Sequence, residues 1–92
     1  MSRITTIHPK TYDDAQMVGR AIRDGIPVVL NLTGVAEAVA YRIVDFSAGV
    51  VFGVRGSLER VTPRVFLLSP AQVNIKVEEP EDKGPAHDLF AD

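Results

Sequence analysis

The chain of 92 residues contains no cysteine, which excludes both a disulfide framework and a thiolate metal site. It has no apolar run of about 18 residues, the length needed to span a bilayer. The first ten residues, MSRITTIHPK, also lack the apolar core of a signal peptide. These absences predict a cytoplasmic protein with no membrane-spanning segment of its own.

Histidine is scarce, with only His8 and His87, and no carboxylates are spaced around them as metal ligands would be. No serine or threonine stands in a recognisable arrangement with a general base. Gly49, Gly53 and Gly56 follow a GxxxGxxG spacing, whereas a dinucleotide-binding loop needs GxGxxG between a strand and a helix. We therefore predict a protein without metal, without cofactor and without enzymatic activity.

Charge is distributed unevenly along the chain. Residues 1–77 hold nine Lys and Arg against six Asp and Glu, whereas residues 78–92 hold six acidic residues and one lysine. A mildly basic body suits an acidic partner peptide and lacks the strongly basic surface of a nucleic-acid-binding protein. We predict a core domain over residues 1–77 and an acidic, disordered tail over residues 78–92.

Hydrophobic periodicity predicts strands that alternate with helices. The predicted strands are 3–8, 26–32, 50–54 with a continuation at 58–61, 65–69 and 73–77, and the predicted helices are 11–24 and 35–46. The run IPVVLNL is apolar on both faces, which is typical of a central strand covered on each side and parallel to a neighbour. The order β-α-β-α-β-β-β predicts an α/β (α+β) sandwich, with two helices on a mixed sheet of four to five strands.

The middle of the chain, DFSAGVVFGVRG, is strongly apolar and rich in glycine. We expect Gly49 to end the second helix, Gly53 to allow a close backbone approach and Gly56 to form a turn. A chain this short buries only about 60–65% of the surface that its unfolded form exposes, so a partner subunit is a common source of additional burial.

The segment SLERVTPRVFLLSP combines basic and apolar residues. Arg60 and Phe66 lie six residues apart, on the same face if the strand is regular. An arginine beside an exposed aromatic ring would suit an acidic and apolar peptide. The alternative is that Phe66 belongs to the core and Arg60 is a solvated edge residue, and Pro63 interrupts the regularity on which the first interpretation depends.

Four segments, taken in order, resemble the core domain of the bacterial SepF family of cell-division proteins. They are PKTYDDA, RDGIPVVLNLT, RIVDFSAGVVFGVRGSLERV and RVFLLSPAQVNIKV. The resemblance covers residues 3–77, is most specific over residues 42–70 and is closest to the actinobacterial type. It implies a homodimeric adaptor, able to polymerise further, that binds the C-terminal peptide of the filament protein FtsZ at the division site. The family attaches to the membrane through an N-terminal amphipathic helix, which is not found in these 92 residues.

The same resemblance implies roles for individual residues. Arg60 and Phe66, with Leu67 beside them, take the positions that line the peptide pocket. The candidates for the dimer interface are Val39, Ile43, Phe46, Gly49, Phe52 and Gly53. The segment GVAEAVAYRIVDF is more apolar than is usual in the family, which leaves open an alternative: a SepF-like regulatory paralogue that pairs with SepF and modulates its assembly.

Overall fold

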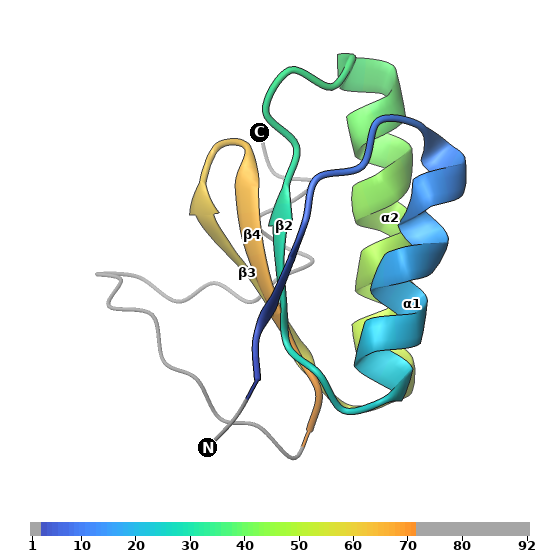
Figure 1. The fold of residues 1–92 in the computed structure, drawn as a ribbon, viewed down its shortest axis with the longest axis vertical. Coiled ribbons are helices and arrows are strands. Elements are labelled where there is room, and N and C mark those ends of the chain that lie inside the picture. Colours follow the sequence, from blue (N-terminus) through green and yellow to red (C-terminus); the bar gives the residue numbers. More distant parts are fainter. Residues whose placement is uncertain (1–2, 72–92) are drawn as a thin grey trace.

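The computed structural model describes residues 3–71, which form a mixed four-stranded sheet with both helices on one face (Figure 1). The elements are β1 (Thr5–Ile7), the 3-10 turn η1 (Tyr12–Ala15), α1 (Gln16–Arg23), β2 (Val28–Asn31), α2 (Glu37–Gly53), β3 (Ser57–Thr62) and β4 (Val65–Ser69). The predicted sandwich of two helices on a mixed sheet is confirmed. The predicted strand 73–77 and the predicted acidic tail 78–92 lie outside the described residues.

The sheet has the strand order β1-β2-β4-β3. β2 pairs in parallel with β1 and antiparallel with β4, as expected of a central strand. Val28 and Leu30 of β2 are fully buried beneath the helices, whereas Val29, on the other face, is half-buried. Within residues 3–71 the predicted covering of both faces is therefore met on one face only, because α1 and α2 pack on the same side (Figure 1).

The first helical segment begins and ends where the sequence predicts. The carboxylate of Asp14 accepts a hydrogen bond from the backbone N–H of Thr11 (3.3 Å), as the spacing of these two residues indicates. At the other end Gly25 adopts a left-handed conformation, with φ of 80°, and the N–H of Ile26 donates to the carbonyl of Ala21 (2.8 Å). This is the hydrogen-bond pattern with which helices commonly end at glycine.

The strand predicted at residues 50–54 is wrong, because α2 continues as a helix to Gly53. The run VVFGV, rich in β-branched residues, favours a strand by local propensity, but such preferences amount to only a few tenths of a kcal/mol per residue. Ile43, Val44, Ser47 and Val51 are buried at helical spacing along α2. Burying one valine or isoleucine contributes about 1.5–3 kcal/mol, so packing on the sheet outweighs propensity.

The glycines predicted to shape this region act at different positions from those expected. Gly49 lies inside α2 rather than at its end, and apart from the adjacent residues and backbone of α2 itself no atom lies within 4 Å of the place where a Cβ on Gly49 or Gly53 would stand. The close backbone approach occurs instead at Gly56, where a Cβ would overlap the carbonyl oxygen of Ser69 on β4. Gly56 therefore allows β3 to begin directly against the end of its neighbouring strand.

The core lies between the sheet and the two helices. Its buried apolar residues are Ile7, Ala15, Val18, Ile22, Val28, Leu30, Leu32, Val35, Ala40, Ile43, Val44, Val51, Leu58, Phe66 and Leu68. Across residues 3–71, neither helix combines the length and hydropathy needed to cross a bilayer.

Candidate functional site

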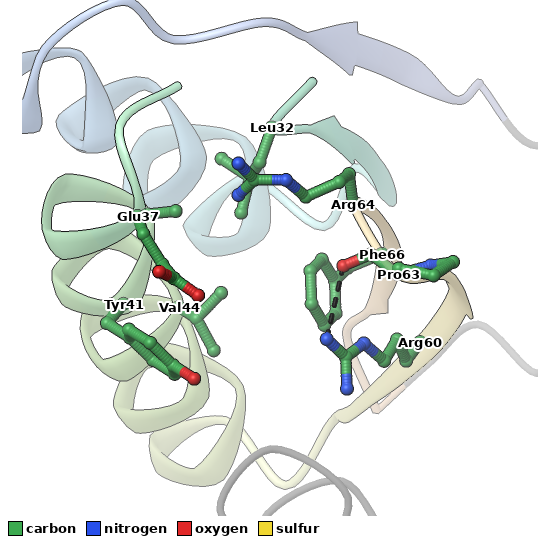
Figure 2. Close-up of a pocket in the computed structure, with 9 residues that line it drawn as sticks. Leu32, Glu37, Tyr41, Val44, Arg60, Pro63, Arg64 and Phe66 are labelled. Carbon is green, nitrogen blue, oxygen red and sulfur yellow. Dashed lines mark hydrogen bonds between the residues drawn. The ribbon is translucent and has the colours of Figure 1, made fainter. Parts of the chain in front are cut away.

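A cavity of about 400 Å³ lies between the first half of α2 and the β3–β4 hairpin (Figure 2). Its volume falls within the range of small-ligand and peptide pockets. The residues that line it are Leu32, Glu37, Ala40, Tyr41, Val44, Arg60, Pro63, Arg64 and Phe66. Segments distant in sequence therefore form one concave surface.

One wall of the cavity is a single face of α2. Glu37, Tyr41 and Val44 follow one another at intervals of four and three residues, which places them on the same side of a helix. Val44 is buried at the bottom of this wall, whereas Tyr41 is 54% exposed at its rim. Figure 2 shows Glu37 and Tyr41 extending from α2 on the side of the cavity opposite the hairpin arginines.

The opposite wall carries Arg60 and Phe66, which face each other across β3 and β4 as paired residues of the antiparallel ladder. The guanidinium carbon of Arg60 lies 5.6 Å from the centre of the Phe66 ring, within the range of a cation–π contact. The same guanidinium donates a hydrogen bond to the carbonyl of Pro63 (3.2 Å), drawn as a dashed line in Figure 2. Arg60 is thus held over the aromatic ring.

Arg64 fixes the tip of the hairpin to the rest of the fold. Its guanidinium donates to the carbonyl of Val35 (2.9 Å), and its own carbonyl accepts a hydrogen bond from the backbone N–H of Leu32 (2.7 Å). A guanidinium has five N–H donors, so both Arg60 and Arg64 keep donors available for a ligand.

The cavity has an apolar floor and two cations on one wall. Leu32, Val44 and Phe66 are buried there, and Ala40 completes the floor. Arginine at the rim of a dry surface suits carboxylates, and apolar residues on the floor suit side chains such as leucine or phenylalanine. No group of three or more His, Asp or Glu that could hold a metal ion occurs in the part of the chain that the structure describes.

The structure brings Arg60 and Phe66 together. It combines the two predicted alternatives, a pair that lines a binding surface and a Phe66 that belongs to the core. Phe66 is only 3% exposed and belongs to the core, yet it also lines the cavity. Pro63 does disturb the ladder, since the register shifts between Arg60 and Thr62, but the bulge follows Arg60 and leaves its pairing with Phe66 intact. Leu67 stands opposite Val29 on the other face of the sheet and does not line the cavity.

Several lining residues were not predicted, among them Glu37, Tyr41 and Arg64. The helical spacing of Glu37, Tyr41 and Val44 was a signal that these three share one face. Nothing in the sequence indicated that this face would lie opposite the hairpin, because Val44 and Arg60, the cavity residues of the two walls that come nearest in sequence, are already 16 positions apart.

The residues predicted for a dimer interface lie in two different environments. Ile43 is fully buried in the core, Val39 is half-buried against it, and the Phe46 ring stands edge-on to Tyr12 at 6.4 Å between centres. The other three, Gly49, Phe52 and Gly53, are exposed at the C-terminal end of α2. Phe52 is 85% exposed, an unusual state for a large apolar side chain in the middle of a chain.

Comparison with known proteins gives consistent matches. The family profile described as "Cell division protein SepF" matches residues 4–75. The "Cell division protein SepF" of Bifidobacterium adolescentis is 98% identical over all 92 residues, and that of Arthrobacter sp. is 60% identical over 75 residues, or 82% of the chain. The chain spans 58% of the length of the first protein, and its match covers 42% of the second.

The fold is similar to two solved structures of low sequence identity. A SepF-like protein from Pyrococcus furiosus superposes with a TM-score of 0.72 at 19% identity, covering 83% of this chain and 95% of that one. A SepF-like protein from Archaeoglobus fulgidus superposes with a TM-score of 0.75 at 13% identity, covering 87% and 99% respectively.

Proposed function

The chain belongs to the SepF family of cell-division proteins, and on that premise we propose that it is a non-enzymatic adaptor whose homodimer binds the C-terminal peptide of FtsZ. In this role it acts in the cytoplasm, at the inner face of the membrane where the septum forms. Because the curated relatives are longer than this chain, the membrane-binding helix is proposed to belong to another part of such a longer protein.

The observation that carries the proposal is the pairing of Arg60 with Phe66 on the hairpin side of the cavity. The apolar floor would supply most of the affinity for a peptide, and the arginines would steer an acidic peptide toward it. A short peptide of this kind binds weakly, around micromolar, and gains avidity when many copies are presented along a filament. Leu67 is left out of the proposed site, since it lies on the opposite face of the sheet.

The proposed dimer interface is the exposed C-terminal end of α2. Phe52 supplies a large apolar side chain, and Gly49 and Gly53 leave open space beside it for a close approach by a second chain. An interface of ordinary size would bury about 800 Å² on each partner. Ile43 is excluded from this surface because it is part of the chain's own core.

The alternative of a regulatory paralogue is less well supported. The 98% identity to a protein named as SepF itself favours the adaptor. The adaptor and paralogue hypotheses are distinguished by mixing this chain with an authentic SepF and measuring the size of the complexes that form. Formation of a heterodimer in preference to either homodimer would favour the paralogue.

The proposal is tested by titrating a labelled FtsZ C-terminal peptide against the 92-residue chain. Arg60→Glu should weaken binding at least tenfold, because it places a like charge beside the acidic peptide at an exposed position. The matched control is Arg20→Glu, the same change at an exposed position on α1 that does not line the cavity. No binding by the wild-type chain at about 0.5 mM peptide would reject the peptide-binding role.

A second variant tests the apolar floor. Phe66→Ala would empty a buried site at a cost of about 3–5 kcal/mol and could unfold the chain. Phe66→Leu keeps most of the volume and removes the ring beneath Arg60. It should weaken peptide binding severalfold while circular dichroism remains unchanged, and equal affinity would show that the aromatic ring takes no part.

A further inference from the structure

The proposed peptide site has a chemical counterpart within the same sequence. The chain ends in GPAHDLFAD, where Leu89 and Phe90 stand next to each other between Asp88 and Asp92. These residues lie beyond the described residues and beyond the family match, which stops at residue 75. The core fold therefore does not account for them.

The chemistry of this segment matches that of the floor and the hairpin wall of the cavity, which lie opposite Glu37 on α2. Two adjacent apolar side chains correspond to the apolar floor formed by Leu32, Val44 and Phe66. Asp88 and Asp92 provide carboxylates for the guanidinium groups of Arg60 and Arg64, whose hydrogen bonds to the carbonyls of Pro63 and Val35 use only part of their donor capacity.

Net charge favours the same pairing over longer range. Residues 78–92 carry six acidic side chains and one lysine, and residues 1–77 carry an excess of three positive charges. Opposite net charges draw the segment toward the body of the protein before any specific contact forms.

The length of chain between the fold and this segment is sufficient. The cavity lies beside Arg64 at the start of β4, and the described chain ends at Ala71, just past its other end. Seven residues of extended strand separate these points by about 23 Å. The 16 residues from 72 to 87 can span up to about 50 Å, so they can return to the cavity with ample slack.

We infer that residues 86–92 of this chain, through Asp88, Leu89 and Phe90, occupy the cavity between α2 and the β3–β4 hairpin and compete there with an external acidic and apolar peptide. The inference rests on the proposed peptide site and adds a regulation of it. A tethered segment at an effective concentration of about 2 mM, with its own dissociation constant near 1 mM, leaves about one third of the cavities free. External peptide would then bind about threefold more weakly than to an unoccupied cavity.

The test uses the full chain with the double substitution Leu89→Ser and Phe90→Ser, which removes the apolar anchors and keeps every charge. The matched control is Ala86→Ser with Ala91→Ser, which changes the same segment and leaves both anchors. The first readout is the set of backbone amide resonances of Arg60, Arg64 and Phe66. They should move in the anchor variant and stay in place in the control. Identical hairpin resonances in the wild type and the anchor variant would overturn the inference.

The second readout is the affinity for the FtsZ C-terminal peptide, which should rise about threefold in the anchor variant and remain unchanged in the control. Failure of the two proposals can be told apart. If the peptide binds neither chain but the hairpin resonances respond to the anchor variant, the FtsZ role fails and occupancy by the tail is supported. If the peptide binds both chains equally and the resonances do not respond, the tail plays no part and the FtsZ role is retained.

Discussion

The guanidinium of Arg64 donates a hydrogen bond of 2.9 Å to the main-chain carbonyl of Val35, and this contact joins the two walls of the cavity. Val35 is 8% exposed and lies just before the start of α2. The side chain of a hairpin residue therefore holds the segment that sets the position of the helix. The width of the cavity depends on this contact as well as on the packing of the core.

Arg64→Met should lower the free energy of unfolding by about 1–2 kcal/mol, because it leaves the Val35 carbonyl without its charged donor in a partly buried position. It should also weaken binding of the FtsZ peptide, since one of the two cations at the rim is lost. Urea denaturation and peptide titration measure the two effects. The companion variant Arg64→Lys keeps the positive charge but loses the planar guanidinium. Its stability and its peptide affinity should lie between those of the wild type and Arg64→Met. Unchanged stability in both variants would mean that the contact contributes nothing.

Gly56→Ala should destabilise the chain by about 2–4 kcal/mol, because its Cβ would overlap the Ser69 carbonyl, a main-chain atom that cannot move aside cheaply. Gly49→Ala is the matched control, with open space around the new methyl group inside α2. It should stabilise the chain by up to about 1 kcal/mol through helix propensity. Thermal unfolding at low protein concentration compares the two. Equal shifts in Tm would contradict the assignment of the close approach to Gly56.

Ser47→Ala should raise the free energy of unfolding by about 1 kcal/mol. Ser47 is fully buried in α2, and its hydroxyl has no hydrogen-bond partner among the described residues. Replacing it removes a desolvated polar group and introduces the residue with the best helix propensity. Denaturant titration measures the change. A loss of stability would reveal that the hydroxyl has a partner, such as a buried water.

Phe52→Ser should shift the chain toward monomer if the end of α2 is the dimer interface, because within residues 3–71 it removes the most exposed large apolar side chain. Met17→Ser provides the control, since Met17 is a 48% exposed apolar residue on α1, outside the proposed surface. Sedimentation velocity over a range of protein concentrations measures the monomer–dimer equilibrium of the two variants, and only Phe52→Ser should shift it. A wild-type chain that remains monomeric at the highest concentration would reject the dimer itself.

Most of the helix and strand boundaries follow from local signals that the sequence carries. The Thr11–Asp14 spacing and Gly25 mark the ends of the first helical segment, and the run around Val28 marks the central strand. These signals succeed because each depends on residues only a few positions apart. The segment around Val51 was predicted wrongly for the same reason, since its β-branched residues favour a strand locally and the helix forms through burial against the sheet.

The candidate site was predictable only in part. The interval between Arg60 and Phe66 indicated a shared face, and the hairpin places them directly opposite each other. Glu37 and Tyr41 could not be assigned to the same site, because nothing in their local sequence specifies which surface α2 packs beside. Leu67 was included as a neighbour of Phe66, yet alternation along β4 places it on the other face.

The sequence by itself determined the class of the fold, the central strand, the interruption at Pro63 and the family, because each is encoded in periodicity, in backbone preferences or in ordered motifs. Only the tertiary structure decided that α2 extends to Gly53, that Gly56 is the point of close contact and that Arg64 reaches Val35. These features depend on the burial and hydrogen bonding of segments that are distant along the chain. The free energies of these long-range contacts exceed local conformational preferences, but the sequence does not specify which segments make them.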